Sequence, residues 1–363
     1  MDKPRIITFY LPQFHPTPEN DVWWGRGFTE WTNVTKAKPQ FSGHYQPHLP
    51  SDLGFYDLRL AETREDQADL ARQYGIHGFC YYHYWFHGTR ILERIFEDVF
   101  NSGKPDFPFC LCWANESWTK TWIGGDKDIL LHQTYSAEDD LNHIKYLIPI
   151  FKDPRYIRVN NKPLLVIYRT DTITERLPEM LALWNEELNK AGIEGLHLCS
   201  VRNPPPENFA ATINFFPDFS LIPFSIQDKL KYTFGRDVLR SFKHTIFSYP
   251  KLVDHLMKAP APDYPMYHCP VPSWDNTPRR GDTSALILKD SSPEIFEKWL
   301  DSCLQDTIKK FEGEEQLVFI NAWNEWAEGT HLEPDQKWGH AYLKAVLNSL
   351  KKLDGEKVQS ENG

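Results

Sequence analysis

Short apolar runs alternate with longer amphipathic stretches along most of the chain. The short runs have the length of buried strands, and the longer stretches carry apolar residues at helical spacing. Eight runs are expected to form strands: 5–12, 76–82, 107–113, 163–168, 196–201, 211–216, 266–271 and 317–322. The stretches expected to be helical are 58–74, 91–100, 137–151, 177–191, 293–311 and 340–353. Strands that alternate with helices predict a parallel sheet flanked by helices.

Polar and aromatic clusters follow several of the expected strands, which favours a closed barrel over an open sheet. A barrel gathers functional side chains at the C-terminal ends of all its strands, whereas a doubly wound sheet binds its ligand at one switch point. We therefore predict an α/β protein, a single (β/α)8 TIM barrel with elaborated βα loops, over residues 1–353. A polar, disordered tail is expected at 354–363, and the segment 220–262 is expected to carry a loop insertion.

Charge and composition exclude several classes of partner. The 363 residues carry a formal net charge of −10 without a basic stripe, so we expect no nucleic-acid or anionic-membrane partner. No apolar stretch is long enough for a membrane insertion. The N-terminus lacks the features of a signal peptide, which predicts a cytoplasmic protein. The six scattered cysteines are expected to be buried free thiols. The oligomeric state is left open.

Aromatic residues make up 14% of the chain, and many stand next to Asn, Glu, His or Gly. Flat apolar walls with polar edges suit a sugar ring, because aromatic faces stack on the ring while polar groups bind its hydroxyls. The expected partner is therefore an oligo- or polysaccharide substrate. The residues predicted to bind it are Tyr10, His15, Trp24, Glu30, Tyr82, His83, Trp113, Asn115, Glu116, Tyr168, Trp274, Asp275, Trp323 and Asn324.

The strongest candidates for chemistry follow the last expected strand. Glu325 and Glu328 stand three residues apart, a spacing that brings the Cβ atoms of a helical turn to about 5–6 Å. Glycosidic cleavage uses one protonated and one ionised carboxyl group, at about 5–5.5 Å in retaining enzymes and about 6.5–9.5 Å in inverting ones. Closeness in an aromatic, partly dry site separates the two pKa values. We predict that Glu325 and Glu328 are the catalytic residues.

No other motif points to a metal or a cofactor. Asp126 and Asp128 form the Asp-x-Asp pattern of metal-dependent sugar transferases, but a solvated turn explains it. His83 and His87 have the spacing of a helical metal pair, yet they follow a strand and lack the HExxH glutamate. A Gly-x-Ser-x-Gly elbow is absent, which argues against a serine hydrolase. We expect neither metal nor cofactor at the site.

The segment Trp323–Thr330 resembles the glutamate motif of the family 99 glycoside hydrolases, which are retaining endo-α-mannosidases and endo-α-mannanases on (β/α)8 barrels. The chain as a whole is similar to the related WbsX group of bacterial polysaccharide and O-antigen gene clusters, whose members are often described as glycosyltransferases. The likeness is carried by segments 7–16, 27–33, 44–50, 78–85, 113–116 and 323–330. It implies that Glu325 takes the proton of the substrate 2-hydroxyl, which attacks C1 to form a 1,2-anhydro sugar. Glu328 would then protonate the leaving group and later activate water.

These observations predict a metal-independent, retaining, endo-acting glycoside hydrolase for an α-linked polysaccharide that is mannan-like or contains rhamnose. One alternative is a glycosyltransferase that builds O-antigen, which would require a nucleotide sugar. Another is a sugar-binding barrel without catalysis, which the intact glutamate pair disfavours. The residues do not identify the sugar or the linkage.

Overall fold

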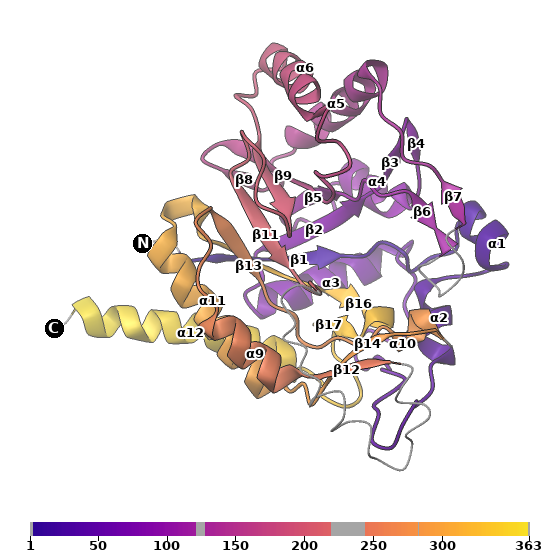
Figure 1. Ribbon diagram of the computed structural model, residues 1–363, viewed down its shortest axis with the longest axis vertical. Coiled ribbons are helices and arrows are strands. Elements are labelled where there is room, and N and C mark those ends of the chain that lie inside the picture. Colours follow the sequence, from indigo (N-terminus) through magenta and orange to yellow (C-terminus); the bar gives the residue numbers. More distant parts are fainter. Residues whose placement is uncertain (1–2, 121–127, 219–243, 282, 362–363) are drawn as a thin grey trace.

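The computed structural model describes residues 3–120, 128–218, 244–281 and 283–361 (Figure 1). Eight parallel strands form the central sheet, in the order β13-β11-β10-β9-β5-β2-β1-β15. Their bounds are β1 (Arg5–Tyr10), β2 (Gly78–His83), β5 (Phe109–Trp113), β9 (Lys162–Ile167), β10 (His197–Val201), β11 (Ala211–Phe215), β13 (Met266–Cys269) and β15 (Leu317–Ile320). All eight expected strands are confirmed.

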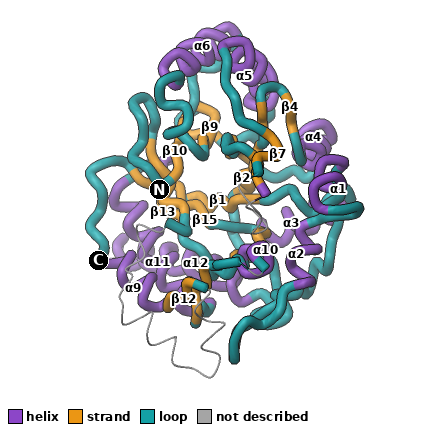
Figure 2. The backbone as a smooth tube through the Cα atoms, turned by 45° about the vertical axis from the view of Figure 1, so that its right-hand side comes forward, coloured by secondary structure: helices purple, strands orange, loops and turns teal. Residues whose placement is uncertain are grey.

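The sheet curls into a nearly closed barrel. Its two end strands, β13 and β15, come together just beyond their last residues, where the Asn321 N–H donates to the Pro270 carbonyl at 3.3 Å. Figure 2 shows the strands around the centre and the long helices outside them. The prediction of a (β/α)8 TIM-barrel fold is therefore confirmed.

The expected helices surround the barrel. The bounds of the first five lie within a few residues of those predicted, whereas the last helix continues beyond its predicted end at residue 353. These helices are α3 (Ala61–Gln73), α4 (Glu93–Ser102), α5 (Ala137–Phe151), α6 (Leu177–Lys190), α11 (Pro293–Lys310) and α12 (Ala341–Glu361). Local signals set their ends: the Ser136 hydroxyl accepts the Asp139 N–H at the start of α5, and Gly75 follows α3 with a φ of +79°. Helix α12 continues past Leu353, the residue at which the barrel domain was predicted to end. The domain boundary itself stays a prediction.

Shorter elements fill the βα loops. Those on the first half of the chain are α1 (Pro18–Trp24), α2 (Glu30–Lys36), β3 (Trp85–Phe86), β4 (Thr89–Arg90), β6 (Trp118–Thr119), β7 (Ile129–Leu131) and β8 (Arg158–Val159). Those on the second half are β12 (Thr245–Ser248), α9 (Tyr249–Lys258), α10 (Thr277–Arg280), β14 (Leu286–Lys289), η3 (Gly313–Glu315), β16 (Asn324–Glu325), η4 (Trp326–Glu328) and β17 (Thr330–His331). The sequence predicts a loop insertion within residues 220–262. Residues 219–243, which include much of that segment, lie outside the described part of the chain.

Side-chain alternation along the strands divides the core into two layers. Phe9 points into the barrel, where its ring lies 5.7 Å from that of Tyr82 and 4.9 Å from that of Phe215, centroid to centroid. Tyr10, the next residue, points outward and donates its hydroxyl to Gln67 of α3 at 2.6 Å. This alternation decides which residues at the strand ends can reach the barrel mouth.

Two further features belong to the chain as a whole. All six cysteines are buried free thiols, as expected. Among the described residues, none of the helices combines the length and apolar character that a membrane crossing requires.

Candidate active site

The two predicted catalytic glutamates lie on a hairpin that follows β15. Strands β16 and β17 pair antiparallel, with Glu325 opposite Thr330, and the turn between them is η4, which contains Glu328. Asn324 fixes the hairpin to the end of β1, since its side chain accepts the Leu11 N–H at 2.8 Å and donates to the Leu11 carbonyl at 3.0 Å. In Figure 1 the hairpin lies next to α10 and α2.

Gly329 allows the loop after β13 to approach the hairpin closely. Its φ is +62°, and a Cβ at this position would lie 2.9 Å from the backbone N and O of Asp275. The Asp275 N–H donates to the Glu328 carbonyl at 2.7 Å. The turn that contains Glu328 is thereby held against the residues that follow β13.

Arg279 of α10 connects three carboxylates. Its Nε lies 2.7 Å from Glu30 Oε1, its Nη2 2.7 Å from Glu325 Oε2 and its Nη1 2.7 Å from Glu328 Oε1. Arg279, Glu30 and Glu325 are buried, whereas the Glu328 side chain keeps 20% of its surface exposed. A guanidinium group suits this position because its donors are arranged in a rigid plane.

Burial and charge alter the protonation of the glutamate pair. Burial raises the pKa of Glu325 to about 8, although Arg279 lowers it in part, and the charges of Glu328 and Glu30 add to the increase. Burial likewise raises the pKa of Glu328, again against Arg279. One guanidinium cannot neutralise three carboxylates, so the pair favours retention of a proton near neutral pH. A site with one protonated and one ionised carboxyl group can act as both acid and base.

A cavity of about 400 Å³ opens above the two glutamates, within the size range of ligand sites. Its lining combines aromatic and polar side chains. The aromatic ones are Tyr82, Tyr84, Trp118, Tyr168, Phe215 and Trp274, and the polar ones include Arg202, Asn276, Glu325 and Glu328. Burial first, and then the Glu325 charge, raises the pKa of Tyr82 and of Tyr84, so both keep their hydroxyl protons. Such a surface offers stacking faces and hydrogen-bond donors to a ring with several hydroxyls.

Six of the predicted residues line this cavity: Tyr82, Glu116, Tyr168, Trp274, Glu325 and Glu328. Two other predicted residues lie outside the cavity lining and bind groups that position the site. Glu30 binds Arg279, while the Asp275 carboxylate lies 2.6 Å from His44 Nε2, accepts from Gln46 Nε2 at 2.7 Å and accepts the Thr277 N–H at 3.0 Å. Asp275 therefore orders the turn that carries Arg279.

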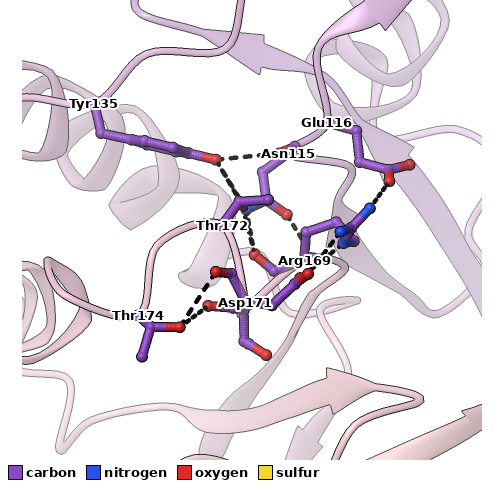
Figure 3. Close-up of polar contacts among 8 residues, drawn as sticks. Asn115, Glu116, Tyr135, Arg169, Asp171, Thr172 and Thr174 are labelled. Atoms are coloured by element: carbon purple, nitrogen blue, oxygen red, sulfur yellow. Dashed lines mark hydrogen bonds and ion pairs between the residues drawn. The ribbon is translucent and has the colours of Figure 1, made fainter.

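A polar network borders the cavity on the side of β5 and β9 (Figure 3). Asn115 accepts the Arg169 N–H and donates to the Arg169 carbonyl, both at 2.8 Å. The Arg169 guanidinium pairs with Glu116 and, at 2.6 Å, with Asp171. Asn115 thus holds the arginine that orients Glu116. A second cavity of about 460 Å³ lies against this network and shares Glu116 with the first.

The remaining predicted residues do not reach the cavity, which corrects their expected positions. Tyr10, His83 and Trp113 point to the outer face of the barrel, because the strand alternation turns them toward the helices. His83 Nε2 lies 2.9 Å from His143 Nε2 of α5, and the Trp113 ring packs 4.7 Å from that of His143.

The other predicted residues that do not reach the cavity lie outside the barrel strands. Trp323 is fully buried, and its ring centroid lies 5.2 Å from that of Phe79. Asn324 binds the backbone of Leu11. His15 is buried, and burial lowers its pKa to about 4. Trp24 packs against Phe28, whereas the preceding residue, Trp23, stacks on the cavity residue Trp118 at 6.3 Å.

Several site residues could not be recognised from the sequence, chiefly Arg279, Arg202, Tyr84 and Trp118. Arg202 follows β10 with a φ of +67° and lies 5.4 Å from the Tyr168 ring centroid and 5.2 Å from that of Phe215. Its position directly after a strand was a usable signal. Arg279 had a weaker one, since it stands only a few residues beyond the recognised cluster at 274–276.

One group among the described residues could supply metal ligands, and it lies apart from the glutamates. It consists of His48, His331 and Asp335, which lie outside the lining of the glutamate cavity. Of the Asp-x-Asp pattern, Asp126 and Lys127 lie outside the described part of the chain.

The fold and the site together define the class of protein to which the chain belongs: a (β/α)8 barrel with an arginine-bridged glutamate pair at its mouth. Among solved structures, the chain is similar to a glycoside hydrolase-like protein (TM-score 0.58, 13% identity, covering 96% of this chain and 94% of that one). It is also similar to the GH99 endo-α-mannosidase of Bacteroides thetaiotaomicron (TM-score 0.57, 13% identity, 98% of both chains). At this identity the likeness shows the fold.

The chain belongs to the WbsX family. The family profile, described as glycosyltransferase WbsX, matches residues 6–346. The protein WxcX of Xanthomonas campestris pv. campestris, from strain B100 and from strain ATCC 33913, is 41% identical over 350 residues. This match covers 95% of the chain but 49% of WxcX, so the chain spans about half the length of these relatives.

Proposed function

We propose that this protein is a retaining glycoside hydrolase that cleaves an α-linked polysaccharide, mannan-like or rhamnose-containing, within the chain. The observation that carries the proposal is the glutamate pair, Glu325 buried and Glu328 partly exposed, that shares one guanidinium group at a cavity with aromatic walls. The raised pKa values of both glutamates support it, because the reaction needs one proton donor and one proton acceptor. The GH99-like fold is consistent with it.

In the proposed first step, the proton that the pair shares lies on Glu328. The Glu325 carboxylate accepts the proton of the substrate 2-hydroxyl, and that oxygen attacks C1. The bond from C1 to the leaving oxygen breaks, and Glu328 donates its proton to that oxygen. In the second step, Glu328 accepts a proton from water and the water oxygen attacks C1. The bond from C1 to O2 breaks, and Glu325 returns its proton to O2. The enzyme ends in its starting state.

The surroundings support these roles in separate ways. Arg279 forms ion pairs at 2.7 Å with both carboxylates and offsets part of their negative charge, and its Nη2–H also donates a hydrogen bond to Glu325. The partial exposure of Glu328 suits the group that must meet first the leaving oxygen and then water. Trp118, Tyr168 and Trp274 offer aromatic faces to the sugar.

A glycosyltransferase is the second candidate, and the family description favours it. Both candidates can use the same glutamate pair, because a retaining site can pass its intermediate to water or to another sugar. They differ in the donor, since a hydrolase needs only the polysaccharide whereas a transferase of this kind needs a nucleotide sugar.

A reducing-end assay on a panel of α-mannans and rhamnose-containing O-antigen polysaccharides distinguishes the two. The wild type is assayed without nucleotide or metal, and a second series adds nucleotide sugars. Release of new reducing ends in the first series supports the hydrolase. Activity confined to the second series, with transfer of the sugar to an acceptor, would replace the hydrolase by the transferase.

A further inference from the structure

Three buried potential ligands lie behind the catalytic hairpin, away from the glutamate cavity. His331 belongs to β17, His48 to the loop before α3, and Asp335 to the segment before α12. All three are buried, and their ligand atoms lie within 4.8 Å of one another. They line a separate cavity of about 140 Å³, which has room for a water molecule.

The two histidines are spaced like ligands of one ion. His48 Nδ1 donates a hydrogen bond to His331 Nε2 at 3.0 Å. Two nitrogens bound tetrahedrally to zinc, each about 2.0–2.1 Å from the ion, would be roughly 3.3 Å apart. A separation a few tenths of an ångström wider would therefore admit an ion, which would take the place of the shared proton.

Surrounding groups already orient the ligand atoms. His331 Nδ1 lies 2.9 Å from the Glu333 carbonyl and donates its proton there, so Nε2 presents a lone pair. Asp335 Oδ1 accepts the N–H groups of Lys337 at 3.0 Å and Trp338 at 2.5 Å. A backbone carbonyl behind a histidine and hydrogen bonds behind a carboxylate are typical of metal ligands.

The charged groups around the cavity suit a cation. The lining contains Asp275, Asp290 and Asp335 together with Lys289 and Lys337, and Lys337 lies 4.5 Å above the Tyr45 ring. Three carboxylates therefore outnumber two ammonium groups around the cavity.

We propose that His48, His331 and Asp335 bind one divalent transition-metal ion of the zinc class, with a water molecule as fourth ligand. The ion would brace the catalytic hairpin rather than act on substrate. Trp326 stacks on His331, with ring centroids 3.7 Å apart, and belongs to the same turn as Glu328. Metal binding at His331 would therefore stiffen the turn that holds the glutamate, whatever reaction the site catalyses.

Zinc binding tests this proposal on the full chain. The protein is stripped with a chelator, dialysed and titrated with zinc chloride by calorimetry, and its melting temperature is measured with and without zinc. We expect one equivalent to bind and the melting temperature to rise. His48→Gln and Asp335→Asn should each weaken binding about 10-fold or more, whereas His255→Gln, at an exposed position of α9, should leave it unchanged.

Cobalt provides a readout that does not depend on the variants. A four-coordinate cobalt(II) complex with two imidazoles and a carboxylate gives visible absorption bands, which zinc should remove in competition. A folded wild type that neither takes up zinc saturably nor shows these bands would overturn the proposal. So would zinc binding that persists unchanged in folded His48→Gln and Asp335→Asn.

Discussion

The hairpin after β15 and the segment that follows it carry glutamates in two contrasting environments. Glu325 and Glu328 face a cavity and share one guanidinium with Glu30. Glu333 faces the core and accepts from neutral donors alone: Trp326 Nε1 at 2.6 Å, the Tyr56 hydroxyl at 2.7 Å and Gln67 Nε2 at 2.6 Å. Burial raises the pKa in both places, to about 8 for Glu325 and about 7 for Glu333.

A raised pKa therefore does not by itself distinguish a catalytic glutamate from a structural one. What differs is access: Glu325 and Glu328 line a cavity of about 400 Å³, whereas the Glu333 carboxylate is enclosed by its three donors. Substitutions in the two environments should therefore have different effects. At Glu325 and Glu328 they should lower catalytic activity, and at Glu333 they should lower stability.

The largest expected effect is on turnover. Glu328→Gln keeps the size of the side chain but cannot transfer a proton, so kcat/KM should fall roughly 10²–10⁴-fold. Glu333→Gln is the matched control, and its kcat/KM per folded molecule should stay within a few-fold of wild type. Equal losses in both variants, measured on circular-dichroism-verified protein, would remove the distinction between the two environments.

The second-largest expected effect is the loss of stability when the Arg279 guanidinium is removed. Arg279→Gln leaves three buried carboxylates without their guanidinium, which should lower the free energy of unfolding by about 3–5 kcal/mol. The loss should be larger at pH 8 than at pH 5, because protonation relieves the unpaired charge at low pH. Urea unfolding measures it, with exposed Arg94→Gln of α4 as a control expected to cost at most about 1 kcal/mol.

Stability as a function of pH should reveal Glu333. Its pKa in the folded protein is raised to about 7, above the ordinary 4.5, so the folded state binds the proton more tightly than the unfolded state. Wild type should therefore lose stability as pH rises from about 4.5 to about 7, by up to about 1.4 kcal/mol per pH unit from this group.

Glu333→Gln provides the control for that titration. The amide cannot ionise, but it turns an N–H toward one of the three donors, which should cost about 1–3 kcal/mol at pH 5. The difference between the two proteins should shrink as the pH approaches 7. A constant difference in urea unfolding across this range would show that Glu333 does not titrate there.

Activity as a function of pH should instead reveal the cavity pair. Since the pKa of Glu325 is raised to about 8, kcat/KM should fall about tenfold per pH unit above that value, as the pair loses its shared proton. The decline should be unchanged in Glu333→Gln. A decline that begins near pH 5 would contradict the proton retention inferred from burial.

The smallest expected effect compares two neighbours on β2. Tyr82 lines the cavity and His83 packs against α5. Tyr82→Phe removes one hydroxyl and should lower kcat/KM about 3- to 10-fold, the range of a single hydrogen bond. His83→Gln should reduce stability by about 1 kcal/mol without changing kcat/KM. The reverse pattern would mean that the inward and outward faces of β2 are misassigned.

The fold was largely predictable because its signals are local. Most barrel strands are largely apolar, as in Leu317–Ile320, and α5 occupies the expected residues Ala137–Phe151. The glutamate pair was predictable for a similar reason, since both residues stand in one short motif after a recognisable strand. Their burial pattern and hairpin geometry were not contained in that motif.

Two parts of the site could not be predicted in this way. Arg279 meets Glu30 across 249 positions of the chain and Glu325 across 46, and no sequence pattern encodes such a contact. The outward-facing Tyr10, His83 and Trp113 were misplaced because polar strand ends were taken together, without deciding which residue of each strand faces inward. Applying the alternation from a single inward residue, Phe9, would have separated Tyr82 from His83.

The most direct test of the central claim is time-resolved proton NMR of wild-type protein with a polysaccharide that it cleaves, in the absence of nucleotide. A retaining glutamate pair predicts that new reducing ends appear first in the α configuration and equilibrate later. New ends that appear first as β would mean inversion and a water between the two carboxyl groups. That result would contradict the retaining mechanism proposed for Glu325 and Glu328.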